Sequence, residues 1–329
     1  MAIVASELAV YKAAINDDTG SNGGVMSATE AVDGASDIWP AVGLSERTAG
    51  STKYRKSFYK NSNATDTVLQ NALLGLWAPT PGDDELYLIS ADQNNSQSSL
   101  TGSEPLYGAG RLNAPAAAND TVITVLVEDG ATIIFRDTEK IRISNMSDPE
   151  DAGGTEEFAT ISGTPVVAGE VVTITLSSGL LNAYGTSDTY IASMIEVGEV
   201  KSTVTVPVVT SASGTVDEAQ LGLHNIGGIE QAWTATFTSG TAYDLVGTTV
   251  GAVGSGATGA SFAPLNGDFG TAYLTLAAAF WAGTWLAGDT VSFTTSPAAV
   301  PVFEKRVIPA GADSSAGNNR KILLWGESA

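Results

Sequence analysis

The sequence is divided into short, strand-like runs that end at glycine-containing turns, and this pattern constrains the fold more than any other feature. Residues 121–127 (TVITVLV) are rich in β-branched residues and are followed at once by the turn 128–130 (EDG). Residues 140–144 (KIRIS) and 232–237 (AWTATF) have the same character. Because alternating β-branched and aromatic residues favour half-buried strands, and glycine-containing clusters favour turns, the pattern predicts an all-β chain.

The length of 329 residues allows two or three domains, each large enough to bury a core. The spacing of the runs is typical of antiparallel β-sandwiches or small β-barrels. Residues 16–24 (NDDTGSNGG) are polar and glycine-rich, which favours an extended N-terminal arm. We therefore predict an arm over 1–28, a mixed and mainly β N-terminal domain over 29–113, a β-barrel or β-sandwich domain over 114–200, and an Ig-like β-sandwich C-terminal domain over 201–329.

Composition excludes several chemistries. The chain has no cysteine, a single histidine and a formal net charge of −21. Without cysteine there is no disulfide framework, no thiolate nucleophile and no cysteine-ligated zinc or iron–sulfur cluster. One histidine excludes a metal site with several histidines, and the acidic balance predicts no direct binding of nucleic acid. We expect no cofactor and no metal ion.

Neither the start of the sequence nor its apolar runs indicate a membrane protein. The first 20 residues lack the basic segment of a secretory signal. The most apolar window, residues 272–287, is shorter than the roughly 20 residues that span a bilayer, and its threonines and glycine favour a buried strand pair. We expect a protein that is made in a cytoplasm and does not associate with a membrane.

Three groups of residues are candidates for chemistry or ligand binding. His224 is the one imidazole available to a hydrolase triad, but no serine lies in a G-x-S-x-G motif, so a structural histidine is the preferred interpretation. Acidic clusters such as 83–85 and 148–151 leave a calcium site or a glycosidase pair as alternatives. Trp281 and Trp285 form either a sugar-stacking platform or part of a core. We expect no enzyme, with a carbohydrate-binding or adhesion module, calcium-dependent in one version, as the alternative function.

The basic residues are concentrated in two segments, with no Lys or Arg between Ser202 and Glu304. Such segregation in an acidic chain suits docking onto acidic neighbours, whereas solvated strand faces are the alternative. The predicted partner-contact residues are Arg47, Lys53, Arg55, Lys56 and Lys60 in the first segment, and Lys305, Arg306, Arg320 and Lys321 in the second.

Several runs resemble those of a known group of proteins. They are residues 106–113 (LYGAGRLN), 226–234 (IGGIEQAWT), 262–264 (FAP), 283–291 (GTWLAGDTV) and 296–311 (SPAAVPVFEKRVIPAG). Together they resemble uncharacterised virion structural proteins of tailed double-stranded-DNA bacteriophages, over most of the chain from about residue 36 onward.

The resemblance implies a structural component of the virion, made in the host bacterial cytoplasm and present in several copies. It implies contacts with other virion proteins and with copies of the chain itself, in a homo-oligomer or a symmetric assembly. A position on the capsid, at the neck, or in the tail or baseplate is compatible with it. The matching runs are strand starts and turns, so the resemblance implies no catalytic residue.

Overall fold

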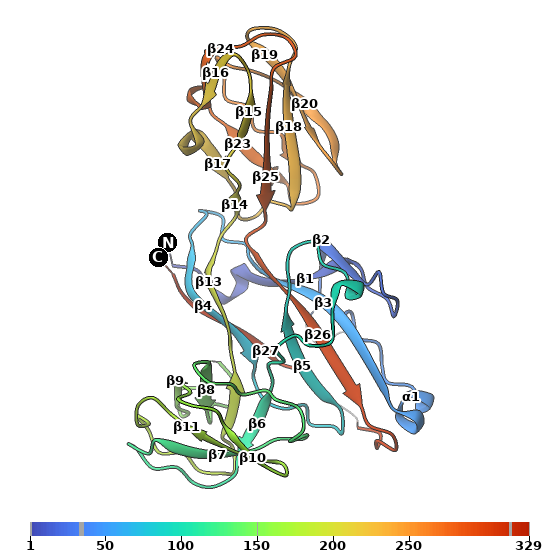
Figure 1. The fold of residues 1–329 in the computed structure, drawn as a ribbon, viewed down its shortest axis with the longest axis vertical. Coiled ribbons are helices and arrows are strands. Elements are labelled where there is room, and N and C mark those ends of the chain that lie inside the picture. The colour runs from blue at the N-terminus through green and yellow to red at the C-terminus, as the bar shows by residue number, and fades with distance from the viewer. Residues whose placement is uncertain (1, 33–35, 150, 316–317, 329) are drawn as a thin grey trace.

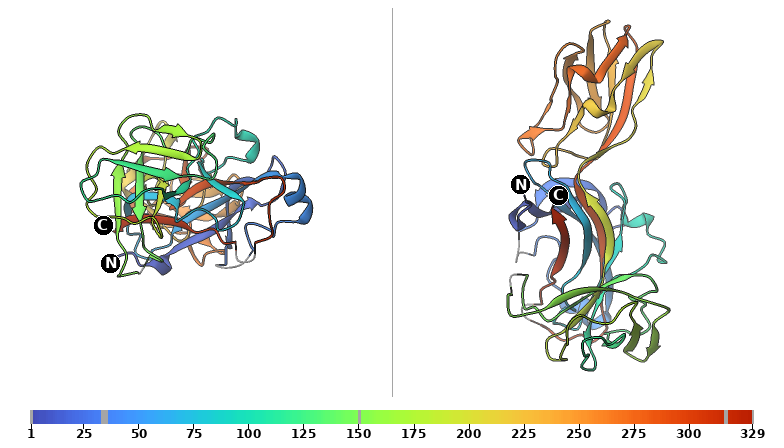
Figure 2. Two further views of the ribbon diagram at one scale, coloured as in Figure 1. Left: turned by 90° about the horizontal axis from the view of Figure 1, so that it is seen from below. Right: turned by 90° about the vertical axis from the view of Figure 1, so that its left-hand side faces the viewer.

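The structure, a computed structural model, describes residues 2–32, 36–149, 151–315 and 318–328. It is elongated, and its sheets form three parts that follow one another along the long axis in Figure 1. We call the middle part the central body, residues 109–194 the first lobe, and residues 202–296 the second lobe. Figure 2 shows from the side that the second lobe projects from the central body.

The prediction of an all-β, antiparallel protein is confirmed. The named strands form two larger sheets, a five-stranded and a three-stranded sheet, and several two-stranded pairs. Each of their ladders is antiparallel, as in the pairing of β26 with both β3 and β5 (bounds below). No described ladder closes a sheet into a barrel. A search of the described residues for an apolar helix long enough to cross a membrane finds none.

The central body consists of a five-stranded sheet, β2-β1-β3-β26-β5, and a three-stranded sheet, β13-β4-β27. Side chains of both sheets, including Leu74, Leu88 and Val302, form its core. Its strands are β1 (Leu8–Ile15), β2 (Gly23–Glu30), β3 (Ser51–Asn61), β4 (Leu69–Leu76), β5 (Glu85–Ser90), β13 (Ile195–Val200), β26 (Ala299–Ile308) and β27 (Ile322–Ser328). Its short helices are η1 (Ala5–Glu7), α1 (Leu44–Ala49) and η2 (Gln97–Ser99).

The first lobe is built on the seven-stranded sheet β10-β11-β7-β6-β12-β8-β9. The sheet curves until Ile161 and Leu176, beyond the ends of β9 and β11, form an isolated bridge. Its inner side carries the core residues Val125, Ile141 and Ile174. The strands are β6 (Ala109–Leu112), β7 (Val122–Leu126), β8 (Lys140–Ser144), β9 (Glu156–Thr160), β10 (Val166–Ala168), β11 (Val171–Thr175) and β12 (Tyr190–Ser193).

The second lobe packs the sheet β14-β25-β18-β19-β20, with β15 also paired to β25, against three two-stranded pairs. Alternation determines which side chains point inward: in β18, Trp233, Ala235 and Phe237 are buried. The strands are β14 (Thr203–Val204), β15 (Val208–Thr210), β16 (Ser213–Val216), β17 (Leu221–Leu223), β18 (Gln231–Phe237), β19 (Ala242–Gly247), β20 (Gly251–Ala257), β21 (Leu265–Asn266), β22 (Thr271–Ala272), β23 (Leu274–Leu276), β24 (Trp281–Thr284) and β25 (Thr290–Ser296), with short helices η3 (Glu218–Gln220) and η4 (Ala278–Phe280).

The prediction of an extended arm over 1–28 is wrong. Strand β1 pairs with β3, from Leu8 opposite Asn61 to Lys12 opposite Ser57, and β2 pairs with β1. The polar tract 16–24 connects β1 to β2 and includes the first two residues of β2. Its side chains find partners far along the sequence, for example Asn22, whose amide donates to the Tyr54 carbonyl at 2.9 Å. Local composition carries no information about such distant partners.

The structure also divides the chain differently from the predicted boundaries. Strand β26 lies between β3 and β5, and β27 pairs with β4, so both ends of the chain build the central body. Strand β13, which we placed in the domain 114–200, also pairs with β4. The two lobes are therefore insertions between strands of one body, and the chain termini lie close together in Figure 1.

Candidate functional site

Four of the nine basic residues predicted to contact partners are buried inside the central body. Arg55, Lys56, Lys60 and Arg306 are buried. This burial corrects the prediction of partner contacts for these four residues, and for the other five it stays a prediction. The reason is that β3 and β26 are inner strands of their sheet, with the three-stranded sheet packed on one side. On the other side, loop carbonyls surround Lys56, and Phe269 of the second lobe lies against Lys60.

A buried carboxylate organises one part of this charged cluster. Glu304 is 0 % exposed and accepts hydrogen bonds from Trp39 Nε1 at 2.7 Å and Ser57 Oγ at 2.7 Å. It also pairs with Arg320, whose Nε lies 2.5 Å from Glu304 Oε2. The Arg306 guanidinium lies 4.3 Å from the centre of the Trp39 ring. Glu304 therefore gives Arg320, whose side chain is 25 % exposed, an internal partner.

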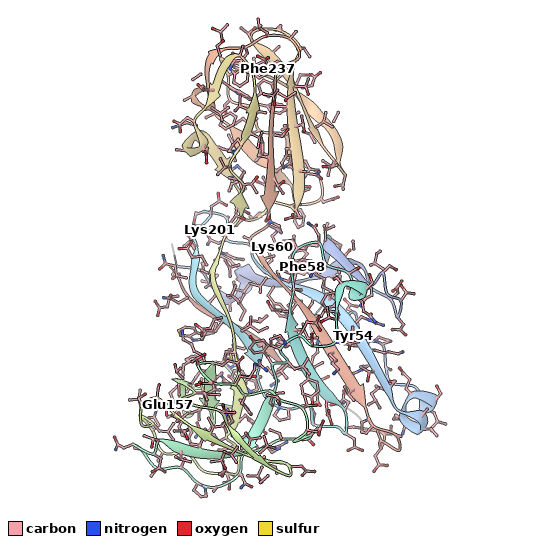
Figure 3. All side chains as sticks on the ribbon, in the orientation of Figure 1. Tyr54, Phe58, Lys60, Glu157, Lys201 and Phe237 are labelled. Atoms are coloured by element: carbon pink, nitrogen blue, oxygen red, sulfur yellow. The ribbon has the colours of Figure 1, made fainter. Side chains whose placement is uncertain are left out.

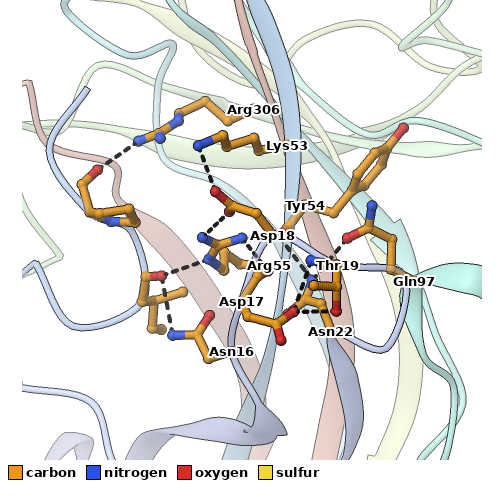
Figure 4. Close-up of polar contacts among 12 residues, drawn as sticks. Asn16, Asp17, Asp18, Thr19, Asn22, Lys53, Tyr54, Arg55, Gln97 and Arg306 are labelled. Atoms are coloured by element: carbon orange, nitrogen blue, oxygen red, sulfur yellow. Dashed lines mark hydrogen bonds and ion pairs between the residues drawn. The ribbon is translucent and has the colours of Figure 1, made fainter. Parts of the chain in front are cut away.

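A second cluster fixes the N-terminal loop to β3 (Figure 4). Lys53 Nζ lies 2.7 Å from Asp18 Oδ2 and 2.6 Å from Glu46 Oε1, and Arg55 also pairs with Asp18. The hydrogen bond from Lys53 lowers the pKa of Asp18, and the bond from Arg55 lowers it further. Arg55 Nη1 donates to the Asp17 carbonyl at 2.7 Å. These contacts explain why the acidic tract of the loop follows β3 rather than extending into solvent.

Lys56 is held by backbone oxygens. Its Nζ donates to the carbonyls of Gly24, Asp92, Gln93 and Asn95 at 2.7, 2.8, 3.0 and 2.9 Å. Burial lowers the pKa of Lys56 to about 8. The arrangement ties the loop after β5 to the beginning of β2, so Lys56 has a structural role within the chain.

Lys60 lies where the central body meets the second lobe (Figure 3). Its Nζ donates to the Ile226 carbonyl at 2.5 Å and lies 3.8 Å from the centre of the Phe269 ring. Tyr11 of β1 presents its ring to the same group at 5.2 Å. Burial lowers the pKa of Lys60 from its ordinary value of 10.5 to about 8. Lys60 therefore connects β3 to the second lobe through a carbonyl and an aromatic ring.

Lys60 predicts a pH dependence of stability. Because its pKa is lower in the folded than in the unfolded chain, the unfolded chain binds more protons between about pH 8 and 10, and this contribution to stability rises with pH. We expect Lys60→Met to flatten the plot of unfolding free energy against pH by up to about 1.4 kcal/mol per pH unit in this range. Urea unfolding from pH 7.5 to 9.5 measures it, with Lys321→Met as the exposed control. Equal slopes for Lys60→Met and wild type would refute the assignment.

His224 also joins the central body to the second lobe. Its Nδ1 lies 3.2 Å from Asp66 Oδ2 and its Nε2 lies 2.9 Å from Thr275 Oγ1, while the Asn225 N–H donates to Asp66 Oδ1 at 2.6 Å. The connectivity is that of an acid–imidazole–hydroxyl chain. The two cavities described next are not lined by any of these residues. The contacts support the interpretation of His224 as a structural histidine.

Two cavities among the described residues have small volumes. One, of about 220 Å³, lies beside β13 and β26 and is lined by Ile195, Val197 and Pro301 among others. The other, between the central body and the first lobe, holds about 20 Å³. Among the described residues, no group of three or more His, Asp or Glu side chains is arranged to hold a metal ion.

Trp281 and Trp285 are part of the core of the second lobe, so of the two interpretations left open by the sequence the structure favours the core over a sugar-stacking platform. Trp285 is 2 % exposed and stacks on Phe237, with ring centres 4.3 Å apart and planes 2° from parallel. Trp281 meets Trp285 edge to face at 5.5 Å. The backbone at Gly214 packs directly on the Trp285 ring, because a Cβ added there would lie 2.5 Å from the ring. No indole face is left for a sugar.

The other predicted contact residues are mostly occupied as well. Arg47 is half-buried and donates to the Ala312 carbonyl at 3.4 Å. Lys305 is half-buried with its Nζ 5.8 Å from the centre of the Tyr87 ring. Lys321 is exposed. Exposed β-branched side chains also lie on the strands of the two lobes, for example Val166 and Val208.

The first lobe exposes the outer side of its sheet. Directly paired residues project to the same side, so Val171, Leu126, Arg111 and Tyr190 form one row across β11, β7, β6 and β12. Val166 of β10, in the next row, is 65 % exposed. Strands β7, β10 and β11 contain no acidic residue. We call this surface the first-lobe face.

The second lobe exposes a similar surface, the second-lobe face, on the outer side of its large sheet. One row crosses it through Val208, Ser292, Thr234, Val246 and Ala252, and Val208 is 65 % exposed. The next row runs through Thr210, Thr290, Thr236, Asp244 and Ser255. Serine, threonine, alanine and valine therefore cover this face, and Asp244 is the charged residue in these two rows.

Sequence reasoning missed both faces. The signal was present as exposed valines at the outward positions of strands, but it acquires meaning only once the register places these residues in rows.

Comparison of the chain with protein-family models, with curated proteins and with solved structures finds no match.

Proposed function

We propose that the chain is a structural component of a tailed-phage virion, present in several copies and acting through contacts with copies of itself and with other virion proteins. The first-lobe and second-lobe faces are the observation that carries the proposal. They expose rows of β-branched side chains, including Val166 and Val208, on a chain whose net charge is −21. Exposed apolar patches of this kind are typical of protein–protein contact sites.

Two features of the architecture and one of the sequence support this function. In the central body, charged groups such as Glu304 have partners within the body rather than facing solvent. The lobes project from it in opposite directions along the long axis (Figure 1). The resemblance of runs such as 283–291 and 296–311 to virion structural proteins agrees with a role in an assembly. A position on the capsid, at the neck, or in the tail or baseplate fits the proposal equally.

Quantitative mass spectrometry of gradient-purified phage particles tests the proposal. We expect peptides of this chain to co-sediment with the particles at a fixed, multi-copy ratio to the major capsid protein. A cytoplasmic enzyme from the same lysate is the control, and its peptides should be removed by the gradient. A chain that is abundant in the lysate and absent from the particles would contradict the proposal.

A further inference from the structure

The two lobe faces differ in the sign of their isolated charge. On the first-lobe face Arg111 is exposed, with its Nη1 3.1 Å from the Tyr190 hydroxyl, and its described side-chain contacts include no carboxylate. On the second-lobe face Asp244 is exposed and accepts a hydrogen bond from Ser255 Oγ at 2.6 Å. Because residues 202–304 contain no Lys or Arg, Asp244 has no cation on its own lobe.

Copies of an acidic chain repel one another unless they meet on surfaces that avoid like charges. The first-lobe face satisfies this condition, since Glu128 and Glu170 lie in the turns at its rim. Glu156, which continues the row beyond Tyr190 on β9, is paired with Arg142.

Each of the two charges also has an apolar neighbour on its face. Leu126 is paired with Arg111, and Val246 lies two residues along β19 from Asp244. The two faces therefore offer one another apolar contact together with one opposite charge pair.

Resting on the proposed function, we propose that the partner of the first-lobe face is a second copy of this chain, whose second-lobe face it covers with Arg111 opposite Asp244. Sheet faces rich in β-branched side chains pack on one another in this way in β-sandwiches. The contact joins two different surfaces, so it is heterologous. Repeated from copy to copy, it produces a ring if the rotation closes and a filament if it does not.

Charge reversal tests this contact in the full-length protein. We expect the wild type to self-associate with increasing concentration in sedimentation-velocity experiments. Arg111→Glu and Asp244→Lys should each weaken this association by about tenfold or more, because each places like charges together. The double variant R111E/D244K should recover it, and so should an equimolar mixture of the two single variants, in which each new face finds its complement.

Lys321→Glu is the matched control, since it makes the same change of charge at an exposed lysine of the central body. It should leave association unchanged, and circular dichroism should show that all variants are folded. A monomeric wild type at high concentration, or single variants that associate like the wild type, would overturn the proposed contact. So would a double variant as weak as the single ones.

The proposed function fails separately from this contact. If the chain is absent from purified particles and still shows the charge-reversal pattern, the contact stands and the virion role is wrong. If the chain is present in particles and Arg111→Glu is incorporated as well as wild type, the virion role stands and the contact is wrong.

Discussion

Glu304→Ala is expected to destabilise the central body by about 3–5 kcal/mol, the cost of breaking a buried ion pair from one side. Glu304 is the common acceptor of Trp39, Ser57 and Arg320. Its removal leaves the partly exposed Arg320 guanidinium without its carboxylate and the buried Trp39 indole N–H without its acceptor. Glu304→Gln keeps an acceptor for Trp39 and loses the ion pair, so we expect a smaller loss.

Urea unfolding followed by tryptophan fluorescence measures this effect, because Trp39 and Trp77 lie in the central body. The matched control is Glu199→Ala, whose carboxylate pairs with Lys201 at 2.6 Å on the surface. Surface pairs contribute little, so the control should change the free energy of unfolding by no more than about 0.5 kcal/mol. A loss below about 1 kcal/mol for Glu304→Ala would show that Glu304 does not organise the cluster.

Trp285→Ala is expected to destabilise the second lobe by about 3–5 kcal/mol, as for other large buried aromatic residues. The substitution removes the ring that stacks on Phe237 and contacts Trp281, and leaves a cavity above Gly214. The neighbouring Leu286 is 61 % exposed, so Leu286→Ala should change stability by no more than about 0.5 kcal/mol.

Thermal or urea unfolding of the two variants measures the difference, with near-ultraviolet circular dichroism reporting on the aromatic cluster of the second lobe. The same pair of variants also tests the sugar-stacking interpretation. If Trp285→Ala kept wild-type stability and lost binding on a glycan array, the ring would be a ligand platform rather than core.

The strands of the lobes were the most predictable part of the fold. Residues 121–127 and 232–237 alternate clearly, and the structure has β7 and β18 there. In these strands one side faces a core and the other faces water, so the two-residue period of the strand is written into the sequence. Residues 272–287, predicted as a buried strand pair, contain β23 and β24, which pair with β17 and β16 rather than with one another.

The central body was the least predictable part. Its strands β3 and β26 are far apart in the sequence and carry charged residues on both sides, so their pattern is that of solvated strands. Lys56 and Lys60 are buried all the same, because carbonyls and the Phe269 ring from distant segments surround their ammonium groups. The one local signal is that aromatic residues alternate with these lysines in residues 54–60.

The two lobe faces could not be predicted from the sequence either. Each exposed valine of the lobe faces is unremarkable in the sequence, since single exposed apolar residues are common. Register makes the difference, because it places Leu126 between Val171 and Arg111, and Val246 beside Thr234. The predicted contact residues were chosen by charge, and the buried ones among them, such as Arg55, Lys56 and Lys60, have partners within the chain.

A reconstruction of the assembled particle by electron cryomicroscopy tests the central claim, that the chain works as a multi-copy component of the virion, most directly. We expect density for several symmetry-related copies, with the lobes in contact with neighbouring subunits and the central body away from those contacts. Particles whose density is fully accounted for by other proteins would contradict the claim.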